Sequence, residues 1–427
     1  MRRIALISEH ASPLAALGGA DGGGQNVYVA WLARHLAAQG HDVDVFTRRD
    51  GPALAERVRI ADGAWVVHVP AGPPERVPKE RLLPYMPAFA DYVLAACRPG
   101  RGYDLIHANF FMSALVACDV KRRLGLPVVV TFHALGRVRR RHQGGADAFP
   151  EERLAIEDRV VREADRIIAE CPQDAADLEV LYAADPAKLR PAPCGFDPAE
   201  FWPTDKHAAR QLLGLDPDDR IVLQLGRMVP RKGVDTVIRG VARLRREHGV
   251  AARLLVVGGE SRDPDPAVTP EIGRLKHIAA EEGVADAVAF VGARGRPELR
   301  LYYAAADVFV TTPWYEPFGI TPVEAMACGR PVVGAAVGGI KATVVDGETG
   351  FLVPPKDPAA VADRLARLFA NPALLRAFGR RARRRAVARY TWARVCEAVE
   401  AVYEEVLTGR RAARVRRLPA AGRSRGG

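Results

Sequence analysis

Two glutamates, Glu316 and Glu324, lie eight positions apart around the segment Pro317-Phe318-Gly319. In a fully extended chain, eight residues would span roughly 25 Å or more. A turn at Phe318-Gly319 that leads into a helix would fold this span back, so that both carboxylates face one ligand. The N–H groups at the start of such a helix attract anions, and carboxylates accept hydrogen bonds from hydroxyls. The pattern predicts a ligand with hydroxyls at both ends and phosphates between them, as in a nucleotide-sugar.

A glycine-rich segment follows the first expected strand and opens a helix. It runs from Gly18 to Gly24 and contains five glycines. Glycine lets the backbone approach a ligand closely and exposes N–H groups at the helix start. The spacing is not Gly-x-Gly-x-x-Gly, so the dinucleotide fingerprint is absent. We expect a ligand contact here, and a flexible surface turn is the alternative.

A second loop is basic and reads Gly-Arg-Met-Val-Pro-Arg-Lys-Gly from Gly226 to Gly233. The loop follows an expected strand, and ligands of α/β proteins bind at this edge of the sheet. Arg227 and Lys232 would both reach one diphosphate and neutralise a leaving group. The alternative is a pair of solvated loop cations. No acidic cluster suited to Mg²⁺ accompanies them, so neither a metal nor a separate cofactor is expected.

A histidine ends another expected strand, since His133 follows Val128–Phe132. A lone histidine at a strand end is more often packed or solvated than catalytic, but the carboxyl edge of a sheet favours a functional role. His10 and His107 also lie near strand ends, and neither is assigned a role. Gly258-Gly259 ends a further strand, where a close approach to a ligand and a plain tight turn are equally good interpretations.

The elements that would position these residues are two series of short apolar strands that alternate with helical segments. Mostly apolar strands are typical of parallel sheets covered on both faces. Two such series predict two Rossmann-like halves. The expected strands are Ile4–Ile7, Val43–Phe46, Trp65–Val69, Leu105–His107, Val128–Phe132, Ile221–Leu225, Leu254–Val257, Val288–Val291, Val308–Thr311 and Val332–Gly334.

A break in the pattern near Gly195–Pro203 marks the expected linker, because one glycine and two prolines interrupt any regular element there. The last segment with helical spacing of apolar residues runs from about Trp392 to Leu407. The expected organisation is an N-terminal domain over 1–198, a C-terminal domain over 204–388, a helix over 389–407 and a basic, disordered tail over 408–427.

The spacing Glu-x7-Glu with Pro-Phe-Gly inside it resembles the retaining GT-B glycosyltransferases of family 4 (glycosyl transferases group 1). That family includes sucrose-phosphate synthases and the inositol-phosphate glycosyltransferase of mycothiol biosynthesis. Other segments match in the same order, so the resemblance covers about residues 3 to 407. It implies an α/β, GT-B fold: two Rossmann-like domains whose parallel sheets face each other across a cleft. The N-terminal domain would bind the acceptor, the C-terminal domain would bind the nucleotide-sugar, and the last helix would cross back.

The resemblance also implies roles for residues that match the family pattern. It places Glu316 at the hydroxyls of the donor hexose, Glu324 at the ribose hydroxyls and His133 at the donor sugar. The implied catalytic residues are His133, Glu316, Arg227 and Lys232. The implied donor-binding residues are Gly23, Gly24, Gly292, Arg294, Phe318, Gly319, Ile320, Thr321 and Glu324. The implied acceptor-binding residues are Asn26, Lys79 and Arg153.

The implied reaction moves a hexosyl group from a nucleotide-diphosphate sugar to an acceptor hydroxyl, with retention of configuration and without a metal. The acceptor attacks a short-lived oxocarbenium-like species from the leaving-group face, and the departing phosphate oxygen takes its proton. A UDP-sugar is favoured, with GDP-mannose as the other donor. The alternatives are a nucleotide-sugar epimerase on a GT-B-like fold and a non-catalytic nucleotide-sugar binding protein. The absence of the dinucleotide-binding fingerprint weakens a further alternative, an NAD-dependent dehydrogenase.

The resemblance leaves the acceptor open. Lys79 and Arg153 fall where the mycothiol-type enzymes hold the acceptor's phosphate, but Phe110 and Ala134 stand where those enzymes have a tyrosine and a threonine. The loss of two hydroxyl donors weakens the case for the same phosphate acceptor. The loop His133-Ala134-Leu135-Gly136-Arg137 looks more like that of the sucrose-phosphate synthases. The basic run Arg137–His142 would still meet an anionic acceptor.

The chain of 427 residues carries a net charge of +11, and the excess is local. Basic residues gather at 137–141, 380–385 and 408–427. Nucleic acid is not an expected partner, because no recognition fold or aromatic platform accompanies the charge. Contact with anionic lipid or a phosphorylated acceptor fits better, as does a solvated face. Peripheral membrane contact through the basic segments is therefore a hypothesis.

No apolar run reaches the ~20 residues that cross a bilayer, and the apolar stretch at Ile4–Ile7 is too short for a signal peptide. A cytoplasmic protein, at most peripheral at the inner membrane face, is expected. Six scattered cysteines without a Cys-x-x-Cys pair indicate reduced, buried thiols.

Overall fold

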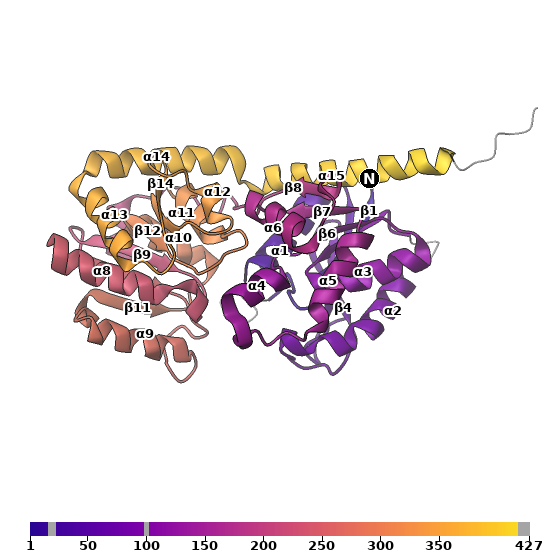
Figure 1. The fold of residues 1–427 in the computed structure, drawn as a ribbon, viewed down its shortest axis with the longest axis horizontal. Helices are drawn as coiled ribbons and strands as arrows, with labels where there is room; N and C mark the ends of the chain where they lie inside the picture. Colours follow the sequence, from indigo (N-terminus) through magenta and orange to yellow (C-terminus); the bar gives the residue numbers. More distant parts are fainter. Residues whose placement is uncertain (16–22, 98–101, 417–427) are drawn as a thin grey trace, which may run out of the picture.

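The computed structural model describes residues 1–15, 23–97 and 102–416, which form two α/β domains side by side (Figure 1). The strands of the N-terminal domain are β1 Arg3–Ile7, β2 Asp42–Arg48, β3 Arg57–Ala61, β4 Ala64–Val69, β5 Leu105–Asn109, β6 Val128–Thr131, β7 Arg166–Ala169 and β8 Leu189–Pro191. The strands of the C-terminal domain are β9 Arg220–Leu225, β10 Ala252–Val257, β11 Val288–Gly292, β12 Val308–Thr311, β13 Val332–Ala335 and β14 Gly350–Val353.

The two sheets have the order of doubly wound folds. The first runs β3-β4-β2-β1-β5-β6-β7-β8, and its pairs are parallel except for β3, which is antiparallel to β4. The second runs β11-β10-β9-β12-β13-β14 with all pairs parallel. In β1, Ile4 and Leu6 face one core while Ala5 and Ile7 face the other. A strand buried on both faces needs apolar residues throughout, which explains its continuous apolar run.

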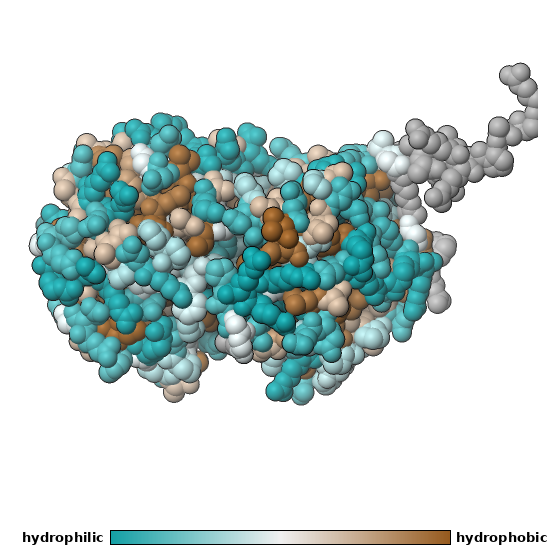
Figure 2. Space-filling view, in the orientation of Figure 1, coloured by the Kyte–Doolittle hydropathy of each residue, from teal (hydrophilic) through white to brown (hydrophobic). Residues whose placement is uncertain are grey.

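Helices cover the sheets. Those of the N-terminal domain are α1 Gly24–Ala38, α2 Met86–Ala96, α3 Phe111–Leu124, α4 Gly136–Gln143, α5 Glu152–Glu163 and α6 Pro172–Tyr182. Those that follow are α7 Lys206–Leu212, α8 Val234–His248, α9 Pro270–Glu281, α10 Arg296–Ala305, α11 Ile320–Ala327, α12 Ile340–Thr343, α13 Pro358–Ala370, α14 Pro372–Arg389 and α15 Trp392–Arg416. Hydrophilic side chains cover most of the face shown in Figure 2, with small hydrophobic areas between them.

All ten predicted strands are present, and four strands were missed. β3 lies at the sheet edge and exposes charged residues, so it lacks the apolar signal of the central strands. β7, β8 and β14 have only three or four residues each. Runs this short give only a weak periodic signal, and β7 and β8 each contain an arginine.

Two chain segments cross between the domains and pair with each other at Phe196. Its N–H donates to Tyr390 O at 2.8 Å, and Trp392 N–H donates to Phe196 O at 3.1 Å. A Cβ at Gly195 would lie 2.9 Å from Tyr390 O, so glycine permits this approach. The domain boundary expected between 198 and 204 falls in the first of these segments, and its position stays a prediction.

The helix α15 crosses from the C-terminal domain onto α1 and β7 of the N-terminal domain (Figure 1). Its apolar face includes the buried Val395, Val399 and Val402. The helix continues to Arg416, beyond residue 408 where the sequence analysis expected a disordered tail to begin. Alanine and arginine have high helix propensity, so the helix can continue past the point where its apolar pattern ends. The remainder, 417–427, lies outside the described residues.

None of the described helices has the length and apolarity that a bilayer crossing requires. All six cysteines are buried and free, which confirms the prediction of unpaired, buried thiols.

Candidate active site

A cavity of about 300 Å³ lies between the two domains, where the strands of both sheets end. Every predicted site residue lines it except Gly292. At the end of β11 the wall is made by Ala293 and Arg294 instead. The carbonyl of Gly292 accepts a hydrogen bond from Gly258 N–H at 2.9 Å. Its placement therefore gives no support for a donor contact, although the neighbouring Arg294 keeps its predicted position.

The described end of the glycine-rich loop meets the C-terminal domain. A Cβ at Gly24 would lie 3.3 Å from Ile320 Cδ1, and one at Gly23 would lie 3.9 Å from Arg227 Nε. The rest of the predicted loop, 18–22, lies outside the described residues. The loop thus approaches the start of α11, where Gly319 adopts a positive φ of 91° that favours glycine. Gly319, Ile320 and Thr321 at the start of α11 line the cavity, and the N–H groups of a helix start suit an anion.

Glu316 lies in the loop between β12 and α11 and is held by Lys232, whose ammonium donates to its carboxylate. Burial would raise the pKa of Glu316, but the charges of Lys232, Arg231 and Arg227 hold it below its ordinary value. Burial also lowers the pKa of Lys232 to about 8, against the opposing effect of Glu316. The pair is therefore an ionised carboxylate beside an ammonium group that loses its proton slightly above neutral pH.

Arg231 is a cavity residue that the sequence analysis did not single out. It sits in the same short 3₁₀ helix as Lys232, Pro230–Lys232. Its Nη1 is buried and has no hydrogen-bond partner. The sequence could have indicated Arg231, because it lies in the basic loop that was already assigned to the diphosphate.

Glu324 lies in α11, as the turn at Phe318-Gly319 predicted. It accepts hydrogen bonds from Arg296 Nη1 at 3.1 Å and from Tyr303 Oη at 3.0 Å. Arg296 is shared, since its Nε also donates to Glu200 at 2.9 Å. Burial raises the pKa of Glu324 above its ordinary value. No local pattern marked Arg296 or Tyr303 as its partners.

His133 reaches the cavity from the end of β6 with a φ of 57°, a conformation rare outside glycine. Its Nδ1 lies 2.9 Å from Glu170 Oε1 and its Nε2 lies 3.0 Å from Asn109 Oδ1. Glu170 is buried, and although burial would raise its pKa, the imidazole holds that pKa below its ordinary value. The ring is thus fixed from both sides, and a strained backbone of this kind clusters at functional sites.

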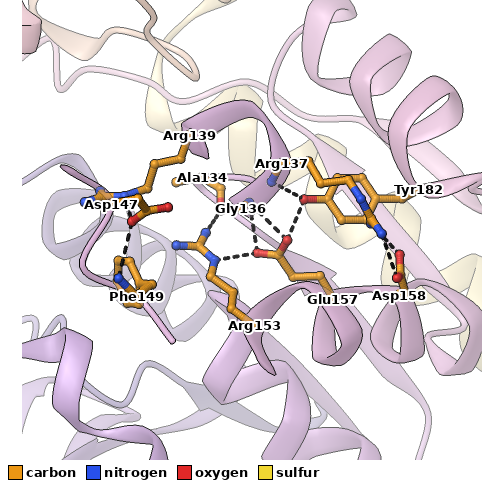
Figure 3. Close-up of polar contacts among 10 residues, drawn as sticks. All are labelled: Ala134, Gly136, Arg137, Arg139, Asp147, Phe149, Arg153, Glu157, Asp158 and Tyr182. Carbon is orange, nitrogen blue, oxygen red and sulfur yellow. Dashed lines mark hydrogen bonds and ion pairs between the residues drawn. The ribbon is translucent and has the colours of Figure 1, made fainter. Parts of the chain in front are cut away.

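On the N-terminal side, Arg153 is almost fully buried, with 2% of its side chain exposed. Its Nε donates to Glu157 Oε1 at 2.8 Å and its Nη2 donates to Ala134 O at 2.6 Å (Figure 3). Its Nη1 has no hydrogen-bond partner. The guanidinium packs 4.5 Å from the centre of the Phe149 ring and 5.0 Å from that of Phe110. The Nη1 amino group of this buried cation is therefore left without a hydrogen-bond acceptor in the protein.

The side chains of the predicted basic run 137–142 do not all point toward the cavity. Arg139 lines the cavity and donates to Asp147 Oδ1 at 2.7 Å. Arg137 points away, to Asp158 and the ring of Tyr182 (Figure 3). Of the six residues in this run, only Arg139 lines the cavity. An acceptor in the cavity would therefore meet one arginine of this helix, not the whole run.

Two family models match the chain in tandem: Glycosyltransferase Family 4 over residues 22–200 and Glycosyl transferases group 1 over residues 205–385. The D-inositol 3-phosphate glycosyltransferase 2 of Catenulispora acidiphila is 41% identical over 98% of both chains. The chain is a family 4 glycosyltransferase. A second relative, the D-inositol 3-phosphate glycosyltransferase of Acidothermus cellulolyticus, is 40% identical over 98% of this chain and 93% of its own.

Among solved structures, the sucrose-phosphate synthase from Thermosynechococcus elongatus is 35% identical, with a TM-score of 0.88 over 96% of this chain and 100% of that one. The family 4 glycosyltransferase therefore has the GT-B fold that the sequence predicted. It is a hexosyltransferase that uses a nucleotide-sugar donor. The epimerase, the non-catalytic binding protein and the dehydrogenase are set aside by this membership.

Proposed function

We propose that this family 4 glycosyltransferase moves a hexosyl group, with retention of configuration, from a UDP-sugar to a hydroxyl of a phosphate-bearing acceptor. One observation carries the proposal. A single cavity joins the Glu316–Lys232 pair to the buried guanidinium of Arg153, whose Nη1 lacks a hydrogen-bond partner. Two relatives, 41% and 40% identical to this chain, are named for D-inositol 3-phosphate, which is a phosphate-bearing compound.

The donor would lie along the C-terminal wall. The N–H groups at the start of α11, together with Arg227 and Lys232, would hold its diphosphate. An ammonium has three N–H donors, so Lys232 can keep its bond to Glu316 while binding phosphate. Glu316 would accept from the hexose hydroxyls and Glu324 from the ribose hydroxyls.

In the proposed reaction the bond between the anomeric carbon and the phosphate oxygen breaks, and the acceptor oxygen forms a new bond on the same face. The proton of the acceptor hydroxyl passes to the departing phosphate. Arg227 and Lys232 stabilise the charge that develops on that phosphate, and His133 contacts the donor sugar. Independence from a metal stays a prediction; within the described chain, no His, Cys, Asp and Glu side chains group into a metal site.

The acceptor's phosphate would lie against the N-terminal wall. Lys79, Arg139 and Arg153 line this part of the cavity, with Asn26 nearby. A ligand oxygen at Arg153 Nη1 would satisfy a buried N–H group that otherwise costs free energy. Phe110 and Ala134 add no hydroxyl donors, so the phosphate would be held by cations more than by neutral groups.

The test is product analysis with purified protein, a panel of UDP-, ADP- and GDP-sugars, and matched acceptors with and without phosphate. We expect transfer from a UDP-sugar to a phosphorylated polyol or sugar, and an axial or equatorial anomeric bond identical to that of the donor by NMR. Glu316→Ala should lower kcat on the order of 100-fold, since a carboxylate that binds two hydroxyls is lost. UDP binding by calorimetry should survive this change.

Equal transfer to the acceptor without its phosphate would contradict the acceptor assignment. Full activity of Glu316→Ala would contradict the donor site. Preference for GDP-mannose would leave the site in place but overturn the choice of base.

Peripheral membrane contact stays a prediction for the basic segments. In α14, Arg380, Arg381, Arg383 and Arg384 are exposed, whereas Arg385 donates to Thr343 O at 2.9 Å and Ala342 O at 2.7 Å. Co-sedimentation with anionic and neutral vesicles would test it, and equal binding to both would contradict it. A cytoplasmic location and the absence of a nucleic-acid partner likewise stay predictions.

A further inference from the structure

The loop that carries Glu316 also makes hydrogen bonds with the N-terminal domain. Gln143, the last residue of α4, donates from Nε2 to Tyr315 Oη at 2.5 Å. Cys171, at the start of α6, donates from Sγ to Pro317 O at 3.3 Å. These two contacts from the N-terminal domain fall on the residues immediately before and after Glu316. The position of its carboxylate is therefore set in part across the domain interface.

Tyr315 contacts both domains through its ring as well. The ring is buried, with the imidazole of His142 stacked on it at a centroid distance of 5.0 Å and an interplanar angle of 19°. The guanidinium of Arg231 lies 5.2 Å from the ring centre. Arg231 O also accepts from Trp314 N–H at 2.9 Å. Tyr315 thus links α4 to the short helix that carries Lys232, the partner of Glu316.

The helix α4 leads from this contact to the acceptor end of the cavity. Its first N–H, at Gly136, donates to both carboxylate oxygens of Glu157 at 3.1 and 3.0 Å, and Glu157 also holds Arg153 (Figure 3). Arg139 lies one helical turn before Gln143, and residues four apart share a helix face. A ligand that binds Arg139 and Arg153 therefore contacts both the helix and its anchor.

We propose that Gln143 and Tyr315 form an interdomain clasp that positions Glu316, and that an acceptor bound at Arg139 and Arg153 tightens it. The inference rests on the proposed function and names two positioning residues, neither of which touches the reacting atoms. With the clasp formed, the cleft stays closed around the donor and water is excluded. With the clasp open, the donor still binds the C-terminal domain, but Glu316 is displaced and hydrolysis competes with transfer.

The test is a double-mutant cycle with Tyr315→Phe and Gln143→Ala. Each change removes one partner of the same hydrogen bond, so each should lower the transfer kcat about three- to tenfold. The double variant should be no slower than the slower single variant, since the two changes are coupled. The KM for the donor should stay within about twofold, and donor hydrolysis per transfer should rise. Tyr92→Phe is the matched control, because its hydroxyl bonds Glu56 at 2.8 Å away from the cleft.

Losses that multiply in the double variant, or an unchanged kcat, would overturn the clasp. Melting temperatures near that of the wild type would show that the variants fold. Small-angle scattering with UDP separates this inference from the proposed function. If the clasp exists, the radius of gyration with UDP is larger in both variants than in the wild type and in Tyr92→Phe, and a phosphate-bearing acceptor lowers it in the wild type and in Tyr92→Phe alone. If no donor supports transfer at all, the proposed function fails while the scattering still decides on the clasp.

Discussion

At the scale of single residues, the pairing of each cation decides what the cleft can bind. Arg296 is committed to Glu324 and Glu200, and its charge supports the protein more than a ligand. Arg153 and Arg231 differ, because each keeps a buried Nη1 without a hydrogen-bond partner. An unpaired buried N–H group is costly. Ligand oxygens at these two atoms would recover that cost on binding.

The pH dependence of donor binding follows from Lys232. Burial lowers its pKa to about 8, so the ammonium is charged below that pH and neutral above it. Diphosphate needs the charged form, so kcat/KM for the donor should fall as pH rises through about 8. Lys232→Arg should remove this fall, because a guanidinium keeps its charge up to about pH 12. The measurement is the pH profile of kcat/KM for both proteins. An alkaline fall with the same midpoint in Lys232→Arg would assign it to another group.

At the scale of elements, α4 is a short helix whose position is set by the carboxylate at its start. Glu157 is fully buried and accepts from Gly136 N–H, Arg153 and the hydroxyl of Tyr182 (Figure 3). These three donors reach both of its carboxylate oxygens, which compensates the cost of burying the charge. The helix therefore has one well-defined direction from its N-terminus, which brings Arg139 to the cavity.

The substitution Gly136→Ala tests this anchor. The new Cβ would lie 2.8 Å from Glu157 Oε2 and 3.0 Å from Arg153 Nε, too close for either to stay. We expect a loss of about 1–3 kcal/mol in the free energy of unfolding and a raised KM for the acceptor, with the donor KM unchanged. Denaturant unfolding and steady-state kinetics measure the two effects. Gly145→Ala is the control, since nothing lies within 4 Å of its added Cβ. Equal effects of the two changes would show that α4 is not anchored this way.

At the scale of the whole molecule, α15 joins the two domains. It leaves the C-terminal domain at Trp392 and packs its apolar face on α1 (Figure 1). Tyr403 Oη lies 2.7 Å from Nδ1 of the buried His107, and burial lowers the pKa of that imidazole to about 3. His107 is therefore neutral, and its pairing with Tyr403 is structural. The helix therefore connects the C-terminal domain to the N-terminal one through its packing on α1 and β7.

Packing of α15 should accordingly contribute to stability. Val399 is fully buried, so Val399→Ala should cost about 2 kcal/mol of unfolding free energy through lost burial and the cavity left behind. Val387→Ala on α14 changes the same atoms at a residue that is 46% exposed and should cost little. Thermal and denaturant unfolding of both variants compare the two. If Val399→Ala were as mild as Val387→Ala, the docking of α15 would not hold the domains together.

The sequence by itself determined the sheet strands with long apolar runs, the turn that joins Glu316 to Glu324 and the loop that carries Lys232. These features are local, since strand burial, glycine turns and helix starts are written in neighbouring residues. Only the tertiary structure decided how the site is held. Gln143 contacts Tyr315, which is 172 positions away in the sequence, and His133 contacts Glu170, which is 37 positions away. The first contact depends on how the two domains pack and the second on how β6 and β7 pair within the N-terminal domain, and no local pattern records either geometry.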